Sequence, residues 1–238
     1  MKVISDFEYC VDSPDYISPI GATHDDTTSI PYIKDIETYF NGQKLTTIEL
    51  GCAGGRIVMD MIERGHDSYG LEGTHFPLKL KRPAWVKYYG KNLFNCDLSK
   101  PFTLLDDNDE LMQFDVISHW EFLEHIPTES IDLLLANLYR YLKDDGIILC
   151  GVSPWGPTTN PKHGHQDLVG HVVHHQSCFM QEEWNDKYFN RFFEVHQYPF
   201  DNKLRPAWNY KLNIGSFYTM LKKKTGVEDM VNNIIENE

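Results

Sequence analysis

Long apolar runs are missing from this sequence of 238 residues. No stretch approaches the ~20 consecutive apolar residues that a membrane-spanning helix requires, so the sequence predicts no membrane span. The first ten residues include Asp6 and Glu8, and they lack the basic and then apolar layout of a secretory signal peptide. These absences favour a cytoplasmic protein.

Cysteine is also sparse. The five cysteines are odd in number and scattered along the chain, and no two of them form a Cys-x-x-Cys pair. This pattern excludes a disulfide framework and a zinc knuckle, and it is typical of reduced, buried thiols.

The sequence has few basic residues: it contains 22 lysines and arginines and 35 aspartates and glutamates, which give a net charge of −13. Proteins that bind nucleic acid usually present a basic face, since much of their affinity comes from neutralised phosphates. The two basic clusters, at residues 79–82 and 222–224, are short, and we interpret them as solvated surface. We therefore expect a small-molecule substrate and disfavour a nucleic acid.

Apolar residues make up 41% of the sequence and aromatic residues 13%, which is enough for a folded hydrophobic core. The length suits one domain of ordinary size, and no internal repeat or low-complexity linker divides it. We predict a core domain over residues 45–225, preceded by an N-terminal lid or extension over 1–44 and followed by a tail over 226–238.

The chain is organised around residues 46–55, with the sequence Thr-Thr-Ile-Glu-Leu-Gly-Cys-Ala-Gly-Gly. A short β-branched and apolar run ends in a glycine-rich turn, and a helical pattern begins at Arg56. This predicts a buried strand, a tight loop and a helix N-terminus. Such a junction cradles the polar part of a nucleotide-like cofactor at the carboxyl ends of the strands of an open α/β sheet, although a tight turn without a ligand has the same pattern.

Acidic residues end or follow the next predicted strands. Residues 68–72 form one strand, which ends in Glu72 at a spacing from the glycine loop that allows a carboxylate to accept both ribose hydroxyls of a nucleoside. Residues 92–98 form another and contain Asp97, which is either a ligand contact or a turn-forming residue. Further strands are predicted over 114–118, 147–152, 191–198 and 212–222, with helices over 56–64, 128–143 and 180–188.

Two motifs resemble those of one enzyme family. Glu49-x-Gly51-x-Ala53-x-Gly55 is similar to the first motif of the class I S-adenosylmethionine (SAM) dependent methyltransferases, with Ala53 in place of the middle glycine. Residues 120–127, Trp-Glu-Phe-Leu-Glu-His-Ile-Pro, resemble the Glu-Val-Leu-Glu-His-Val-Pro segment that follows the fourth strand in many of these enzymes. The resemblance implies an α/β fold, a Rossmann-like three-layer sandwich with a seven-stranded, mostly parallel sheet whose last strand is antiparallel.

The same resemblance implies SAM as the cofactor and assigns its contacts residue by residue. The glycine loop holds the methionine part, the end of the second strand holds the ribose, residues after the third strand hold the adenine, and residues after the fourth strand flank the cofactor. The residues for the methionine part are Glu49, Gly51, Cys52, Ala53, Gly54 and Gly55, and those for the ribose are Glu72 and Gly73. The residues for the adenine are Asp97 and Leu98, and those that flank the cofactor are Trp120 and Glu121.

A carboxylate–histidine cluster follows the fourth strand. Glu121, Glu124 and His125 are spaced i, i+3 and i+4, so one helical turn brings them to one face. Three interpretations remain open: Glu124 orients His125 as a base or substrate ligand, the trio joins a distant histidine to hold a metal, or the residues only brace the loop. We assign Glu124 and His125 to catalysis and expect no metal, because no convincing second pair of ligands is spaced nearby.

A second histidine group lies in the long polar loop after the fifth strand. It comprises His163, His165, His171, His174 and His175. Residues 173–177 resemble a segment of the family in which a histidine reaches across the site to the substrate, and we favour His175 over His174 as the third catalytic residue.

The sequence therefore predicts O-methylation of a small polar metabolite, such as a sugar or sugar nucleotide, with N-methylation second and a homodimer as the assembly. One rival is a metal-assisted 2′-O-methyltransferase of RNA 3′ ends, which shares a Glu-x-x-Glu-His core. Another is a non-catalytic, SAM-binding partner subunit. A nicotinamide dehydrogenase is disfavoured, because Arg56 occupies the position where its Gly-x-Gly-x-x-Gly loop needs the last glycine.

Overall fold

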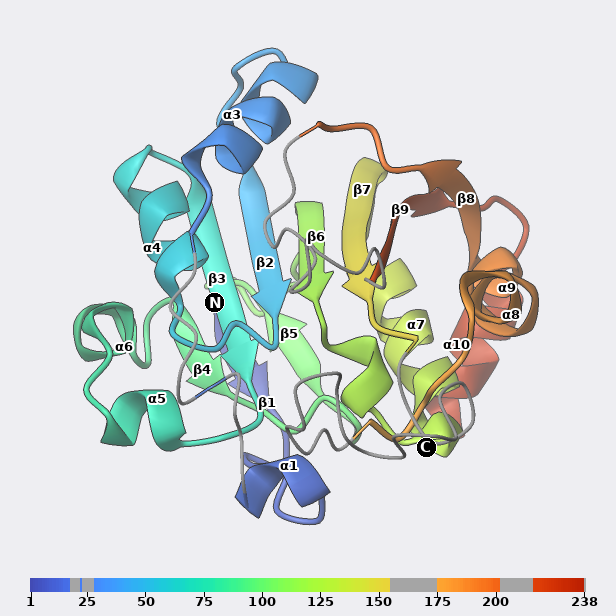
Figure 1. Cartoon of the computed structure of the whole chain (residues 1–238), viewed down its shortest axis with the longest axis horizontal. Coiled ribbons are helices and arrows are strands. Elements are labelled where there is room, and N and C mark those ends of the chain that lie inside the picture. Colours follow the sequence, from blue (N-terminus) through green and yellow to red (C-terminus); the bar gives the residue numbers. More distant parts are fainter. Residues whose placement is uncertain (18–21, 23–27, 155–174, 202–215, 238) are drawn as a thin grey trace, which may run out of the picture.

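The computed structural model describes residues 1–17, 22, 28–154, 175–201 and 216–237 (Figure 1). Its main sheet has seven strands in the order β4-β3-β2-β6-β7-β9-β8. Strands β4, β3, β2, β6 and β7 are parallel neighbours, and β9 runs antiparallel to both β7 and β8. The predicted fold class, with its antiparallel last strand, is confirmed. The strands are β2 (Thr46–Leu50), β3 (Asp67–Glu72), β4 (Leu93–Asn95), β6 (Phe114–Trp120), β7 (Leu142–Val152), β8 (Phe193–Gln197) and β9 (Phe217–Lys223).

Helices cover both faces of this sheet (Figure 1). Side chains alternate between faces along a strand, and in β7 Ile147 and Leu149 pack with α3 (Ile30–Tyr39) and α4 (Arg56–Glu63). Ile148, between them, faces the larger cluster built on α7 (Ile131–Tyr141). Two apolar layers therefore enclose the sheet. The remaining helices are α1 (Pro14–Ile17), α5 (Phe76–Lys79), α6 (Pro83–Tyr88), α8 (Gln181–Trp184), α9 (Asn190–Phe192) and α10 (Glu228–Glu236).

The two chain ends add structure to the core domain. Strand β1 (Lys2–Ile4) pairs antiparallel with β5 (Thr103–Leu105) in a separate two-stranded sheet. At the other end, the segment interpreted as a tail contains α10, whose Val231 is buried. The phenol of Tyr139 in α7 donates to the Lys224 carbonyl at 2.9 Å, and it lies 3.0 Å from Glu228 Oε1. Both ends thus pack onto the fold.

Several element boundaries differ from the sequence prediction, among them the start of β7, which lies at Leu142 and not at residue 147. The strand predicted over 92–98 is only three residues long, so Asp97 lies in the loop after β4. Helix α7 begins at Ile131, after a single 3-10 turn at Thr128–Ser130, and not at residue 128 as predicted. The predicted helix 180–188 consists of α8 followed by a π-helical turn at Asn185–Phe189. Residues 212–215 of the predicted last strand lie outside the described residues.

No helix in the described part of the chain is both long enough and apolar enough to cross a membrane.

Candidate functional site

The predicted site residues gather at one edge of the main sheet. Strands β2, β3, β6 and β7 are parallel, so their carboxyl ends meet there, and the figure shows them pointing the same way (Figure 1). The glycine loop follows β2, Gly73 follows β3, and residues 121–125 follow β6. In open α/β sheets this is the edge at which ligands bind.

The glycine loop has a left-handed backbone at three alternate positions. Gly51, Ala53 and Gly55 have φ values of +63°, +44° and +74°. A Cβ atom on Gly51 would lie 2.8 Å from Cδ2 of Phe122, and one on Gly55 would lie 2.8 Å from a methyl group of Leu93. The glycines are therefore required both by conformation and by close packing, and the loop turns tightly into α4.

Two acidic side chains lie behind and beside this loop. Burial, with a contribution from the charge of Glu72, raises the pKa of Glu49 to about 8. Burial likewise raises the pKa of Glu72 to about 7, although the backbone amide of Ala53 donates to its Oε2 at 2.9 Å and partly offsets the shift. Glu72 thus stands at the end of β3, beside the glycine loop, and its contact with the ribose stays a prediction.

The residues assigned to the adenine have other contacts in the structure. Oδ1 of Asp97 accepts hydrogen bonds from the amide and the hydroxyl of Ser99, at 3.0 and 2.7 Å, which is the geometry of an Asx turn. Leu98 is buried in the larger core cluster. Gly73, which was assigned with Glu72 to the ribose, is covered by the N-terminal segment, because a Cβ there would lie 2.8 Å from Sγ of Cys10. The adenine assignment stays a prediction.

The two residues that end β6 and follow it differ in environment. Trp120 packs edge-on to Tyr32, with ring centroids 5.3 Å apart, inside the cluster beneath α3. Glu121 is held at a φ of +52°, while its amide donates to the carbonyl of Gly151 at 2.8 Å and its carboxylate accepts from the hydroxyl of Ser216. A non-glycine residue in this region is strained by about 1–3 kcal/mol, and such strain concentrates at functional sites.

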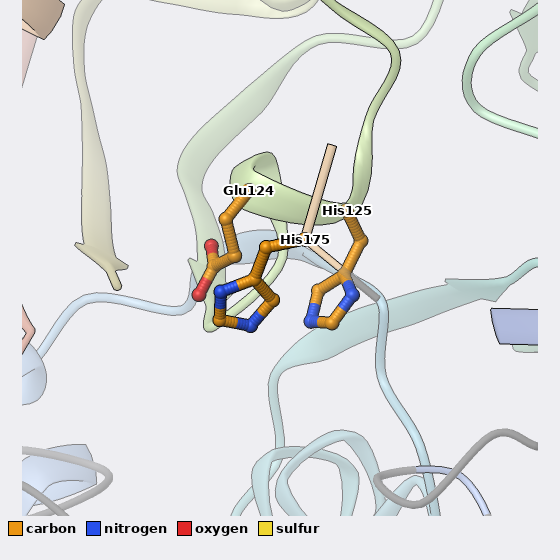
Figure 2. A group of neighbouring side chains, drawn as sticks. All are labelled: Glu124, His125 and His175. Atoms are coloured by element: carbon orange, nitrogen blue, oxygen red, sulfur yellow. The ribbon is translucent and has the colours of Figure 1, made fainter. Parts of the chain in front are cut away.

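Figure 2 shows the three residues predicted to be catalytic, Glu124, His125 and His175, grouped below one turn of helix. Their ligand-type nitrogen and oxygen atoms all lie within 4.8 Å of one another. The two imidazole rings are perpendicular, with centroids 4.7 Å apart. The structure therefore brings together residues that are 50 positions apart in the sequence.

Glu124 is fully buried. Its Oε1 accepts a hydrogen bond from the amide of Ser153 at 3.0 Å, whereas its Oε2 has no hydrogen-bond partner among the described residues. Burial raises the pKa of Glu124 well above its usual range, and the neighbouring charge of Glu121 raises it further. An oxygen in this state is available to a cation or to a donor on a ligand.

His175 owes its position to the two residues that follow it. The amides of Gln176 and Ser177 both donate to the carbonyl of Glu124, at 2.7 and 3.0 Å. Nε2 of Gln176 donates to the carbonyl of His125 at 2.6 Å, and the hydroxyl of Ser177 donates to that of Ile126 at 2.7 Å. These hydrogen bonds fasten the segment to the turn that carries Glu124.

The group of Glu124, His125 and His175 lies at the same edge of the sheet as the glycine loop and Glu72. The charge of His125 lowers the pKa of Glu72 slightly against the larger effect of burial, so the two side chains lie within electrostatic range of each other. A cofactor bound at the glycine loop and Glu72 would therefore lie in the region of His125.

The sequence prediction missed some residues of this edge, and some predicted residues lie outside the described part of the chain. Gln176 and Ser177 had no predicted role, and neither did Trp85, whose indole donates to the carbonyl of Ala53 at 2.8 Å. No periodicity reveals such contacts between distant segments. His163, His165, His171 and His174 lie outside the described residues.

A hollow of about 400 Å³ lies at the opposite edge of the sheet. It is lined by residues at the end of α3 and at the starts of β6 and β7, among them Tyr39, Asp115 and Lys143. The last two form an ion pair of 2.9 Å. This hollow is remote from the carboxyl ends of the strands, so it is not the cofactor site.

Comparisons with known proteins agree with this arrangement. A family model described as a methyltransferase domain matches residues 48–148. The chain is similar to the ubiquinone biosynthesis O-methyltransferase of Pasteurella multocida (strain Pm70), at 27% identity over 124 residues, which are 50% of this chain and 50% of that protein. The chain thus spans about half the length of this curated relative.

Solved structures share the fold at low sequence identity. The PH0226 protein from Pyrococcus horikoshii OT3 aligns with a TM-score of 0.55 at 14% identity, covering 87% of this chain and 97% of that one. A TehB-like SAM-dependent methyltransferase from Corynebacterium glutamicum aligns with a TM-score of 0.50 at 18% identity, covering 82% and 89%. The family model spans residues 48–148, which include the glycine loop and strands β2, β3 and β6, so this part of the chain matches a methyltransferase domain, and the match supports SAM as the cofactor.

Proposed function

We propose that this protein transfers the methyl group of SAM to a hydroxyl group of a small polar metabolite, such as a sugar or sugar nucleotide, with an amine as the second choice of acceptor. The observation that carries the proposal is the close group of Glu124, His125 and His175, in which the half-buried His125 lies within electrostatic range of Glu72. A methyl donor bound at the loop would meet an acceptor held by this group.

In the proposed reaction, a lone pair of the acceptor oxygen forms a bond to the methyl carbon while the carbon–sulfur bond breaks. The electron pair of that bond stays on sulfur, which leaves S-adenosylhomocysteine. Alignment of the oxygen with the methyl group supplies most of the catalysis. The hydroxyl proton passes to a base, and an imidazole suits this role near neutral pH, so His125 is the proposed base and Glu124 orients it.

On the donor side, we infer that the cofactor lies along the glycine loop. The amide-rich turn at Gly51–Gly55 approaches the methionine part, and the carboxylate of Glu72 accepts from the ribose hydroxyls. The fixed position of Glu72 on the amide of Ala53 supports this inference, because it leaves the carboxylate pre-oriented. Asp97 and Leu98 remain the proposed adenine contacts.

Methylation of an RNA 3′ end is the second candidate function. The convergence of two histidines and a glutamate favours it, since that rival requires a metal-binding group. The net charge of −13 disfavours it, because a polynucleotide would be repelled. A small polar acceptor therefore remains the preferred substrate class.

The test is a turnover assay on the purified chain. S-adenosylhomocysteine release would be measured with SAM and a panel of sugars, sugar nucleotides, amines and a short RNA, and S-adenosylhomocysteine binding would be measured by calorimetry. We expect saturable binding and turnover on a hydroxylated metabolite, lost in His125→Ala. Binding without turnover on any acceptor would favour the non-catalytic partner subunit, and turnover on RNA alone would favour the second candidate.

Absence of S-adenosylhomocysteine binding by the folded chain would overturn the proposal itself. The predicted homodimer would be checked on the same samples by light scattering during gel filtration, with a mass of twice 27.7 kDa as the expected result.

A further inference from the structure

We propose that Glu124, His125 and His175 bind one divalent transition-metal ion, of the class of Zn²⁺, Co²⁺ or Mn²⁺ (Figure 2). The site itself is independent of the reaction, but the role that we give it rests on the proposed function.

The first argument is geometric. A carboxylate oxygen and two imidazole nitrogens within 4.8 Å of one another come close to the ligand spacing of a metal site. Metal–ligand bonds of about 2.0–2.2 Å place ligand atoms about 3–3.5 Å apart, so small side-chain rotations complete the site. Figure 2 shows the side chains of all three residues extending to the same side of the turn.

The second argument concerns the unsatisfied oxygen. Oε2 of the fully buried Glu124 has no hydrogen-bond partner among the described residues, while Oε1 is fixed by the amide of Ser153. A buried polar atom without a partner is costly, so such groups are normally hydrogen-bonded or coordinate a metal. Oε2 belongs to the oxygen pair that Figure 2 shows beside the ring of His175.

The third argument concerns charge. Glu121 stands three residues before Glu124 and is half-buried, so a second carboxyl group lies near the first. Within the described part of the chain, no lysine or arginine forms an ion pair with either of them. A bound dication would supply the positive charge that this pair of carboxyl groups lacks.

The fourth argument concerns rigidity. Glu124 and His125 are adjacent on one turn, and His175 is fastened to that turn through Gln176 and Ser177, whose side chains both donate to its carbonyls. Ligands held by such outer contacts lose little freedom when the ion binds. The ligand set is therefore assembled by the fold before any ion is present.

The donor set selects the type of metal. Two imidazoles and one carboxylate suit Zn²⁺, Co²⁺ and Mn²⁺, whereas Mg²⁺ and Ca²⁺ prefer oxygen ligands alone. Three protein ligands leave at least one coordination position open, as in catalytic metal sites. With the ion bound, His125 would be a ligand and would no longer be the base of the proposed function. The acceptor hydroxyl would fill the open position, where the ion would lower its pKa as it does for a bound water, and its proton would pass to a water molecule before the oxygen attacks the methyl carbon.

The experiment uses the full chain, freed of any affinity tag and dialysed against a chelator. Co²⁺ would be titrated while its visible absorption is recorded, and Zn²⁺ would be titrated by calorimetry. We expect one ion per chain and the visible bands of histidine-ligated Co²⁺. Glu124→Gln and His175→Ala should each weaken binding by about 100-fold or more.

His196→Ala is the matched control, because this histidine lies on β8, outside the proposed site, with a side chain that is 41% exposed. Its affinity should equal that of the unchanged chain. Circular dichroism would verify that every variant is folded. Equal Zn²⁺ affinity of a folded His175→Ala chain, or binding of Mg²⁺ in preference to Zn²⁺, would overturn the proposal.

S-adenosylhomocysteine titration of the same samples separates this proposal from the proposed function. Cofactor binding without stoichiometric Zn²⁺ binding would overturn the metal site and leave the methyltransferase proposal intact. Zn²⁺ binding without cofactor binding would overturn the methyltransferase proposal and leave the metal site intact.

Discussion

The backbone amide of Ala53 donates a hydrogen bond of 2.9 Å to Oε2 of Glu72. This contact joins the loop after β2 to the end of β3, across 19 positions of sequence. It fixes the carboxylate and the left-handed turn relative to each other before any ligand binds, and a site held in this way loses less entropy on binding.

Replacement of Glu72 tests that arrangement. We expect Glu72→Gln to weaken S-adenosylhomocysteine binding by about 10- to 100-fold, because charge-assisted hydrogen bonds to the ribose contribute about 1.5–3 kcal/mol. The measurement is calorimetric titration. Glu63→Gln is the control, since Glu63 is an exposed residue of α4 that pairs with Lys87. Equal affinity in both variants would remove Glu72 from the cofactor site.

Gly51 and Gly42 form a matched pair for the loop. Both have positive φ, of +63° and +72°, but only at Gly51 would a Cβ meet another atom, 2.8 Å away on Phe122. Alanine at either position costs about 1–2 kcal/mol of backbone strain, and Gly51→Ala should cost about 1–3 kcal/mol more through the clash. Urea unfolding measures the difference. If both variants lose the same free energy of unfolding, the side chain of Phe122 moves away from the added Cβ without a measurable loss of stability.

Much of the site edge could be predicted because local chemistry determines it. The run from Thr46 to Leu50 forms β2, and the glycines after it are required by φ values that only glycine adopts cheaply. The same holds for Glu72, which ends a strand with a clear pattern. These residues are specified within about ten positions of sequence, so a pattern suffices.

Other features depend on contacts that no local pattern contains. His175 reaches Glu124 through hydrogen bonds of Gln176 and Ser177 to a turn 50 residues earlier, so the sequence indicates this histidine only through a family resemblance and not through a local pattern. Asp97 is ambiguous for a different reason, because an Asx turn and a ligand contact use the same carboxylate. A short helix such as α10 gains its stability from packing, here through Val231.

The buried Glu49 should make stability fall as pH rises. Its pKa is about 8 in the folded chain, against an ordinary value of 4.5, so between these pH values the folded state holds a proton that the unfolded state has lost. The free energy of unfolding then decreases with pH by up to ~1.4 kcal/mol per unit.

The variant Glu49→Gln has no such proton, so its free energy of unfolding should decrease less steeply with pH. The gain in stability over the unchanged chain should be largest toward pH 8. Urea unfolding across this range is the measurement, with the exposed Glu110→Gln as control. An unaltered slope in Glu49→Gln would show that Glu49 ionises normally.

Ser177 provides a test of how His175 is positioned. Its side chain is fully buried, and its hydroxyl donates to the carbonyl of Ile126 at 2.7 Å and lies 3.0 Å from the hydroxyl of Thr128. Ser177→Ala leaves a buried carbonyl without this donor, which costs about 1–3 kcal/mol and loosens the segment that carries His175. We expect lower stability in urea together with weaker Zn²⁺ binding, by about tenfold or more. Ser130→Ala is the control, because that side chain makes no capping hydrogen bond at the start of α7. Should Ser177→Ala lose stability but bind Zn²⁺ as tightly as the unchanged chain, the hydroxyl would stabilise the fold without positioning the histidine.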